Sequence, residues 1–464
     1  MKHRAIHLVA LTVVFAMILA ACSSNDSVDT TTTAEAAEET TTTVAAVEET
    51  TTAAAVEETT TTAAEDVGDM DVACDEPVKV GVITDQTGAL AIYGAHIMRS
   101  FPHGMEYATG APGENDVYTL GDCQIDVIYK DDQSDPEATA TLARELIEAD
   151  DVDVIVGSVS PGATIRIQEL ALANDVIHIA APASANYLTG ATFNPNSFRT
   201  SRNNYQDAAS LCEYLQPVYE TFVQIAPDYS FGYGNAQAFR DACTVEGGEF
   251  VAEDIFAPLD TTDFTPYMEE ILDSGADSWI VTWAGGGFIP MMQAATDLGV
   301  VDEMALATSF VDNQVMPTFF ANLVGTTSGI LYHYTLPNNE INDWLVAKTQ
   351  EVDGTFPDLF DADGMNAAIM IVEALKATGG DASADVLRSA MEGMSFQGPK
   401  GQIDIRAEDH VAMQDMYIVT LTNLDDPEFK FFELVTTNRP DVPCLLEGDY
   451  ANRCGSLPVG SLGG

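Results

Sequence analysis

The first residue that could carry out chemistry is Cys22, which directly follows the small residues Ala20 and Ala21. A basic start and an apolar run over 5–21 precede it, a layout typical of a secretory signal with small residues at its cleavage point. A cysteine at that point predicts a bacterial lipoprotein signal over 1–22, with Cys22 lipidated as the mature N-terminus. The alternative is an uncleaved transmembrane anchor, for which the run is short against a hydrocarbon core of ~30 Å. Both interpretations place the remainder outside the cytoplasm and tie it to a membrane.

The six other cysteines predict disulfides, because an even count is typical of exported proteins. Two of them lie just before predicted neighbouring strands, two on consecutive predicted helices, and two close a short C-terminal loop. The expected pairs are Cys74 with Cys123, Cys212 with Cys243, and Cys444 with Cys454. The sequence does not prove this connectivity. A metal site is the alternative, but no Cys-x-x-Cys motif or histidine cluster favours it, and we expect no metal and no cofactor.

Catalytic motifs are missing from the sequence. It has no Gly-x-Ser-x-Gly elbow and no His-Glu-x-x-His pattern. Gly232-Tyr233-Gly234 lacks the third glycine of a dinucleotide loop, and His178 sits within an apolar strand as a core residue would. We therefore expect a protein that is not an enzyme, although an exported enzyme stays as an alternative.

The formal net charge of −55 excludes nucleic acid as a partner, because binding phosphates requires basic patches. Residues 23–71 are almost entirely Thr, Ala, Glu, Asp, Ser and Val, without Lys, Arg or aromatic residues. Such a segment buries too little apolar surface to fold, and its like charges extend it. We expect a disordered tether there. The rest of the chain is long enough for two lobes.

Short β-branched runs alternate with helical stretches along this remainder, which predicts parallel sheets covered on both faces. Strands are expected at 78–84, 125–129, 152–156, 176–180, 221–226, 249–256, 278–283, 305–308, 329–334, 401–405, 414–422 and 429–435, and helices at 91–108, 135–149, 161–173, 235–245, 264–273, 287–299, 314–324, 340–353, 361–378 and 384–394. Ligands of such sheets bind beyond the carboxyl ends of the strands. The loops 84–93, 157–164, 182–187, 227–234, 283–287 and 308–313 are therefore the candidate site.

An ordered series of motifs at these loops carries a family resemblance. They are Val80-Gly81-Val82-Ile83-Thr84 with Thr87-Gly88 and Tyr93-Gly94, Asp131-Asp132 with Asp135-Pro136, Val156-Gly157-Ser158-Val159-Ser160, Ala181-Pro182-Ala183-Ser184-Ala185, Phe198-Arg199-Thr200, Pro227-Asp228-Tyr229-Ser230-Phe231-Gly232 and Thr262-Asp263-Phe264. From about Val78 to the final strands, the chain resembles the Leu/Ile/Val-binding family of periplasmic binding proteins, which serve ABC importers. Each motif is weak alone, and the series is specific to the family but not to one ligand.

The resemblance implies an α/β, type I periplasmic-binding-protein fold, with two doubly wound lobes joined by a hinge of three crossings near Thr200, Tyr332 and Met413. The first lobe would comprise 72–200 and 333–412, and the second 201–332 and 413–464. Closure of these lobes on a small polar solute is a hinge motion. The implied partners are that solute and the permease of an ABC transporter, with the lipid on Cys22 as the membrane contact, and the chain is expected to be a monomer.

The resemblance also implies which residues hold the ligand. In the first lobe, a ligand carboxylate would meet hydroxyls and N–H groups at helix N-termini, at Ser160, Gly162, Ala183, Ser184 and Ala185. Pro161 stands where a hydroxyl residue is common, and it offers no N–H. The aromatic positions of the cleft correspond to or adjoin Tyr93, Tyr229, Phe231 and Trp283.

One position in the second lobe separates the solute classes. In amino-acid binders of the family an acidic residue meets the ligand ammonium, and the matching residue here is Phe310, with Asp312 two positions later. If Asp312 fills this role, a branched-chain or other amino acid fits. If Phe310 lines the pocket, an amide, a urea-like solute or an aromatic acid fits better. Asp312 is equally a candidate helix N-cap, and a ligand-sensing ectodomain of the same fold is the alternative to an importer component.

Overall fold

The computed structural model describes residues 72–284 and 287–460. The predicted signal, Cys22 and the predicted tether lie outside these described residues. No helix in the described part is long and apolar enough to cross a bilayer.

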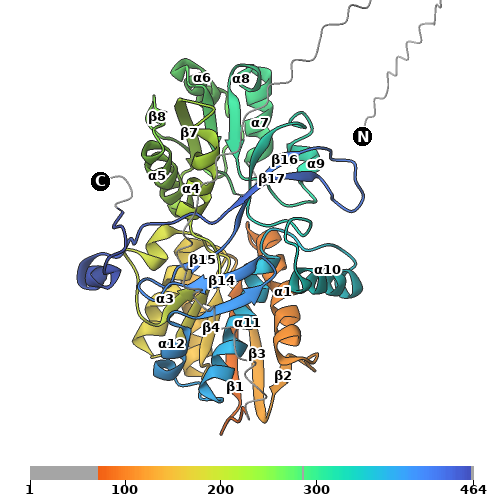
Figure 1. The fold of residues 1–464 in the computed structure, drawn as a ribbon, viewed down its shortest axis with the longest axis vertical. Coiled ribbons are helices and arrows are strands. Elements are labelled where there is room, and N and C mark those ends of the chain that lie inside the picture. Colours follow the sequence, from red (N-terminus) through yellow and green to blue (C-terminus); the bar gives the residue numbers. More distant parts are fainter. Residues whose placement is uncertain (1–71, 285–286, 461–464) are drawn as a thin grey trace, which may run out of the picture. The chain divides into compact units, whose positions relative to one another are not determined.

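The first sheet has the strand order β2-β3-β1-β4-β5-β6, and only β2 runs antiparallel to its neighbour (Figure 1). Its strands are β1 Val78–Thr84, β2 Val117–Leu120, β3 Cys123–Asp131, β4 Val154–Gly157, β5 Ile177–Ala180 and β6 Ser197–Arg199. Successive side chains of a strand point to opposite faces. Val82 accordingly shares a buried cluster with helix α1 (Ala91–Thr109), whereas Ile83 shares another with α2 (Pro136–Glu148) and α3 (Pro161–Ala173). We call this sheet with its helices the first lobe.

The second sheet has the order β11-β10-β7-β8, with β9 also paired to β7. Its strands are β7 Thr221–Pro227, β8 Glu249–Phe250, β9 Ile255–Ala257, β10 Ser278–Val281 and β11 Ala305–Thr308. On one face, Ile280 packs in a cluster with α4 (Asn204–Leu215) and α5 (Ser230–Val245). On the other, Trp279 and Val281 join a cluster with α6 (Thr265–Ser274) and α7 (Phe288–Asp297), which α8 (Val300–Glu303) also enters. We call this sheet with its helices the second lobe.

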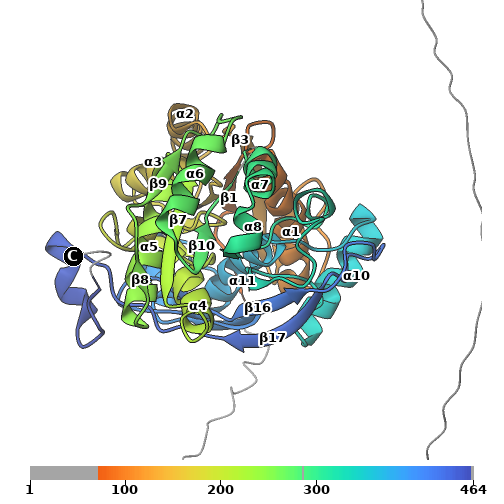
Figure 2. The same cartoon turned by 90° about the horizontal axis from the view of Figure 1, so that it is seen from above.

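Beyond the second sheet, the chain passes between the lobes again. The helices α10 (Glu340–Asp353) and α11 (Asp361–Thr378) pack on α1 of the first lobe, and α12 (Ala384–Met391) packs on α11. The short strands β13 (Ser395–Gly398), β14 (Gly401–Ile405) and β15 (Ala412–Met413) form an antiparallel sheet beside α11. A further antiparallel sheet joins β12 (Thr327–Ile330), β16 (Met416–Leu421) and β17 (Phe432–Asn438), and it lies along α4 (Figure 2).

The chain thus crosses between the lobes after β6, after β12 and between β15 and β16. This mixed α/β architecture with two parallel sheets confirms the predicted fold class. The exact lobe boundaries stay a prediction. The C-terminal segment, which was expected in the second lobe, also contacts the first lobe. The loop closed by Cys444 and Cys454 packs on Phe193, and Arg453 pairs with Glu392. The segment after β17 is therefore a fourth connection between the lobes.

Most predicted elements lie within a few residues of their expected bounds. The expected strand 249–256 is instead the two short strands β8 and β9. The expected helix 314–324 is reduced to α9 (Met316–Phe319), since Asn322 and Gly325, both poor helix formers, follow it. The strands β2, β6 and β13 were not anticipated.

The structure confirms the three expected disulfides. Cys74–Cys123 joins the segment before β1 to the start of the neighbouring strand β3. Cys212–Cys243 joins α4 to α5, and Cys444–Cys454 closes the C-terminal loop.

Candidate functional site

A pocket of about 100 Å³ lies between the two parallel sheets, lined by residues that follow strand ends in both lobes. Leu90 and Tyr93 come after β1, and Pro182 and Ser184 after β5. In the second lobe, Tyr229 and Phe231 follow β7, Thr282 and Trp283 follow β10, and Ser309 and Phe310 follow β11. Because the carboxyl ends of both sheets face this space, the pocket occupies the position where ligands of parallel sheets bind.

Six of the eleven predicted ligand residues line this pocket: Tyr93, Ser184, Tyr229, Phe231, Trp283 and Phe310. The other five, Ser160, Gly162, Ala183, Ala185 and Asp312, lie outside its lining. Ser160 is the N-cap of α3, and its carbonyl oxygen accepts hydrogen bonds from Thr164. The carbonyl oxygens of Ala183 and Ala185 accept from the buried guanidinium of Arg199. The ligand-binding role of all eleven residues stays a prediction.

Aromatic side chains from both lobes form the pocket walls. On the first-lobe side, Tyr93 stands edge-on to Phe360, with ring centroids 5.2 Å apart. On the second-lobe side, the Trp283 ring meets Phe264 at 5.3 Å, and its Nε1 is buried without a hydrogen-bond partner in the described part of the chain. Gly287 lets the backbone pass this close to the indole, since a Cβ there would lie 2.5 Å from the Trp283 ring. The walls therefore suit a flat or branched apolar group.

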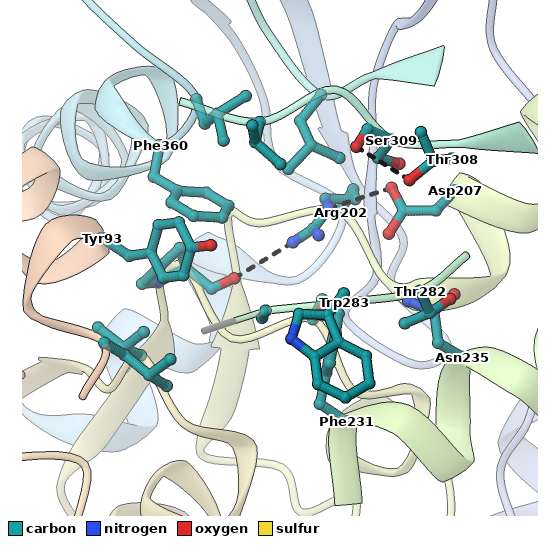
Figure 3. Close-up of a pocket in the computed structure, with 18 of the residues that line it drawn as sticks. Tyr93, Arg202, Asp207, Phe231, Asn235, Thr282, Trp283, Thr308, Ser309 and Phe360 are labelled. Carbon is teal, nitrogen blue, oxygen red and sulfur yellow. Dashed lines mark hydrogen bonds and ion pairs between the residues drawn. The ribbon is translucent and has the colours of Figure 1, made fainter. Parts of the chain in front are cut away.

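One ion pair, between Arg202 and Asp207, faces the pocket (Figure 3). The Arg202 Nε donates to Asp207 Oδ1 at 3.1 Å, and Nη1 makes a long contact of 3.4 Å to the Pro182 carbonyl oxygen. The guanidinium carbon also lies 5.6 Å from the centre of the Phe360 ring. Burial raises the pKa of Asp207, although the neighbouring Arg202 opposes this shift.

A capping box holds this pair in place. The Asn203 side chain accepts from the Gln206 backbone N–H, and the Gln206 side chain accepts from the Asn203 N–H. This arrangement satisfies donors at the helix N-terminus and fixes where α4 begins. Arg202 therefore lies just before the helix, and Asp207 lies on its first turn.

Further buried charges lie behind Arg202. Burial lowers the pKa of Arg199 to about 9, with a further contribution from Arg202. Burial also lowers the pKa of Lys400 to about 8 and raises that of Asp363 to about 7, although the charges of these two groups stabilise each other. The Lys400 ammonium donates to Gln414 Oε1 at 2.9 Å.

Asp312 points to His96 rather than into the pocket. Its Oδ2 lies 2.8 Å from Nε2 of His96, and both residues are 3% exposed. Asp358 completes a group of three ligand-type side chains whose atoms lie within 4.8 Å of one another, a spacing that a divalent cation could bridge. The direct hydrogen bond between His96 and Asp312 already satisfies these two groups. Asp312 also accepts from the Gln314 N–H, but α9 begins at Met316 with Val315 as its N-cap, so Asp312 is not the helix N-cap that the sequence interpretation gave as an alternative.

Sequence reasoning missed Arg202, Asp207 and Phe360 of the pocket lining. Arg202 follows β6, which is too short to be recognised as a strand. Two signals could have found it: the Phe198-Arg199-Thr200 motif just before it, and the Asn203–Gln206 capping pattern just after it. Phe360 lies before α11, on a return of the chain that no strand end marks.

Comparisons with known proteins agree with this geometry. The sequence profile of the periplasmic binding protein family matches residues 77–426. The Leu/Ile/Val-binding protein homolog 6 of Brucella melitensis biotype 1 is 26% identical over 380 residues, covering 79% of this chain and 93% of that protein. A crystal structure of an ABC-type branched-chain amino acid transporter from Rhodopseudomonas palustris CGA009 has 30% identity and a TM-score of 0.67, covering 80% of this chain and 100% of that one.

A solute-binding protein of an ABC transporter from Rhodopseudomonas palustris BisB5, solved in complex with 3,4-dihydroxy benzoic acid, is 26% identical with a TM-score of 0.68. The match covers 78% of this chain and 97% of that one. Proteins of this family act outside the cytoplasm as the binding components of importers. The chain therefore belongs to the periplasmic binding protein family, and it is a solute-binding protein of an ABC transporter rather than an enzyme.

Proposed function

We propose that this protein captures a small organic solute by closing its two lobes around the pocket, and that the closed form delivers the solute to the permease of an ABC importer. The supporting observation is that both lobes supply the walls of a single pocket. A solute held between them interacts with both lobes only when they are closed. It therefore binds the closed form more tightly, and this difference shifts the population toward closure.

The residues that line the pocket favour an apolar solute with one polar end. Phe310 lines the space and Asp312 does not, so the acidic residue expected of amino-acid binders is missing from its place. A volume of about 100 Å³ limits the solute to a single ring or a short branched chain at most, since a cavity of ~150 Å³ holds benzene. The bound aromatic acid in a relative supports this class.

An amino acid is the second candidate, favoured by one observation. Asp207 lies in the pocket lining, from a different element than expected, and it offers a carboxylate to a ligand ammonium. The branched-chain amino acid transporter among the similar structures supports this candidate. Amides and urea-like solutes also remain within the proposed class.

We further propose that lipid on Cys22 anchors the mature chain, with residues 23–71 as a tether between the membrane and the folded body. Two or more acyl chains make a lasting anchor, at about 0.8 kcal/mol for each buried methylene. Replacing Cys22 with Ser should move the protein from the membrane fraction to the soluble fraction of cells. Retention in the membrane fraction would favour the transmembrane alternative.

A thermal-shift screen over aromatic acids, aliphatic acids, amino acids, amides and ureas tests solute capture. A ligand at about 100 times its Kd should stabilise the protein by ~2.7 kcal/mol, which is a clear rise in Tm. The Trp283→Ala variant should bind the selected solute more weakly, because the indole forms one wall. No stabilisation by any of these classes would count against the proposal, and unchanged affinity of the variant would remove Trp283 from the site. Loss of uptake in a deletion strain separates import from sensing.

A further inference from the structure

The charged residues around the pocket indicate which class of solute it binds. We propose that Arg202 anchors the carboxylate of the solute, and that the natural ligand is an organic monocarboxylate without an ammonium group. This inference rests on the proposed function, because it names the solute class for the same pocket. It differs from the sequence interpretation, which expected the carboxylate at Ser160, Gly162 and residues 183–185.

The first step is the free hydrogen-bonding capacity of Arg202. Its Nε is used by Asp207, its Nη1 contact to Pro182 is long, and its Nη2 makes no hydrogen bond to any described residue. A guanidinium carries five N–H donors in a planar fork that matches a carboxylate. Figure 3 shows the group between Phe360 and Asp207, among the labelled pocket residues. The unused donors of Arg202 therefore face the space that the solute would fill.

The second step is the balance of buried charge. Three buried cations, Arg199, Arg202 and Lys400, lie near three buried carboxyl groups, Asp207, Asp363 and Asp409, and interact electrostatically with them. Each of these residues is at most 7% exposed, so solvent does little to screen their charges. Of the three cations, Arg202 lines the pocket, with Asp207 as its ion-pair partner. A carboxylate in the pocket would be a second anionic partner for the unused donors of Arg202.

The third step separates a monocarboxylate from an amino acid. In an amino acid the ammonium would lie near the same guanidinium as the carboxylate, and these two like charges repel each other. Besides Arg202 and Asp207, the described lining carries no charged side chain, and its aromatic residues, among them Tyr93, Phe310 and Trp283, favour an apolar group over a second charge. A single carboxylate on an aromatic or branched aliphatic body fits all of these features.

Calorimetry on the unmodified protein gives the first test, with two matched series of probes: phenylacetate, phenylacetamide and phenylglycine, then isocaproate, isocaproamide and leucine. In each series only the charge of the polar end changes. In at least one series the acid should bind about 30-fold tighter than the amide and the amino acid, because losing one partner of a buried charge pair costs ~2 kcal/mol or more. An amide or amino acid that binds as tightly as its acid would overturn the inference.

Variants give the second test. Arg202→Met should weaken binding of the acid by about 30-fold or more, whereas Arg166→Met, which removes a half-exposed arginine on α3, should leave it unchanged. Asp207→Asn should tighten binding of the acid relative to its amide, since it removes a negative charge beside the ligand carboxylate. A folded Arg202→Met variant that binds the acid within roughly threefold of the parent contradicts the inference.

If Arg202→Met does not fold, the binding of the probe series to the parent and to Asp207→Asn tests the inference. Thermal stabilisation by neutral solutes alone would refute the carboxylate while leaving solute capture intact. Failure of every solute class would instead refute the proposed function.

Discussion

The hydrogen bond between His96 and Asp312 makes a prediction about closure of the lobes. His96 lies on α1 of the first lobe, and Asp312 lies in the loop after β11 of the second lobe, with 2.8 Å between Nε2 and Oδ2. Beside it, the Asn313 N–H donates to Asp358 Oδ2 at 2.9 Å, which adds a second contact between the lobes. Asp312 lies two positions after the pocket residue Phe310, and Asp358 lies two positions before the pocket residue Phe360. Opening of the lobes should break both contacts, so these contacts should strengthen solute binding.

The size of this effect follows from the type of contact. A hydrogen bond between a charged donor and a charged acceptor contributes about 1.5–3 kcal/mol. If the contact exists only in the closed form, a loss of ~2 kcal/mol weakens the apparent Kd by about 30-fold. His96→Leu and Asp312→Asn should each weaken solute binding. The loss of binding free energy in the double variant should be much smaller than the sum of the losses in the two single variants.

Protonation of His96 gives the effect a pH dependence. Burial opposes protonation, but the hydrogen bond to Asp312 and the nearby carboxyl groups of Asp361 and Asp358 outweigh it and raise the pKa of His96. The Phe360 N–H, 3.4 Å from Nδ1, opposes the shift only weakly because the contact is long. Protonated His96 therefore stabilises the closed form. This stabilisation is complete below the ordinary histidine pKa of ~6.5, and it is lost as the pH rises through the raised pKa.

Asp358 acts in the same direction. Burial, and then the charge of Asp312, raise its pKa to about 8, so the closed form holds a proton that an exposed carboxyl group would have released above its ordinary pKa of ~3.9. Solute affinity should therefore fall as the pH rises from about 6 through about 8.

Calorimetric titration of the four proteins of this double-mutant cycle, at about pH 6 and pH 9, checks both statements. A matched control is present on the same helix, since His103 Nε2 lies 2.8 Å from Asp353 Oδ2 on α10, within the first lobe. His103→Leu should lower the Tm and leave the Kd unchanged. The reasoning is refuted if the coupling energy of His96 and Asp312 is below ~0.5 kcal/mol, or if His103→Leu weakens binding equally. Tighter binding of a folded parent on added Zn²⁺ would instead favour a metal site at His96, Asp312 and Asp358.

Two further predictions concern stability. Gly94→Ala should lower the free energy of unfolding by about 1–3 kcal/mol or more, because the new Cβ would lie 1.6 Å from the Asp85 carbonyl oxygen. Calorimetry should show a clearly lower Tm. An unchanged Tm would mean that the backbone moves easily there. Replacing the Cys212–Cys243 pair with serines should cost about 3.7 kcal/mol and the Cys444–Cys454 pair about 2.7 kcal/mol, on loop-closure entropy alone, for sequence separations of 31 and 10. Urea unfolding midpoints measure both, and the reverse order would show that loop length does not control these disulfides.

The position of the pocket could be predicted from sequence because it depends on local patterns. Buried strands such as Val78–Thr84 and Ala305–Thr308 are recognisable from their apolar β-branched residues, and the loops after them supply most of the lining. The three disulfides followed from the same element order, because neighbouring strands and consecutive helices bring their cysteines together.

The electrostatics of the pocket could not be predicted in this way. Arg202 depends on a three-residue strand and on a crossing between lobes, neither of which leaves a periodic signal. The roles of Phe310 and Asp312 depend on which way a loop turns, and they were left open in the sequence interpretation. The structure directs Phe310 to the pocket and Asp312 to His96, a residue 216 positions away in the chain. Contacts of this range are set by packing of the two lobes.

A crystal structure with the solute that gives the largest thermal shift tests the central claim most directly. We expect the solute to be enclosed between Tyr93 of one lobe and Trp283 of the other, with its carboxylate on the guanidinium of Arg202. Electron density for the solute at any other place, with this pocket left without it, would contradict the account.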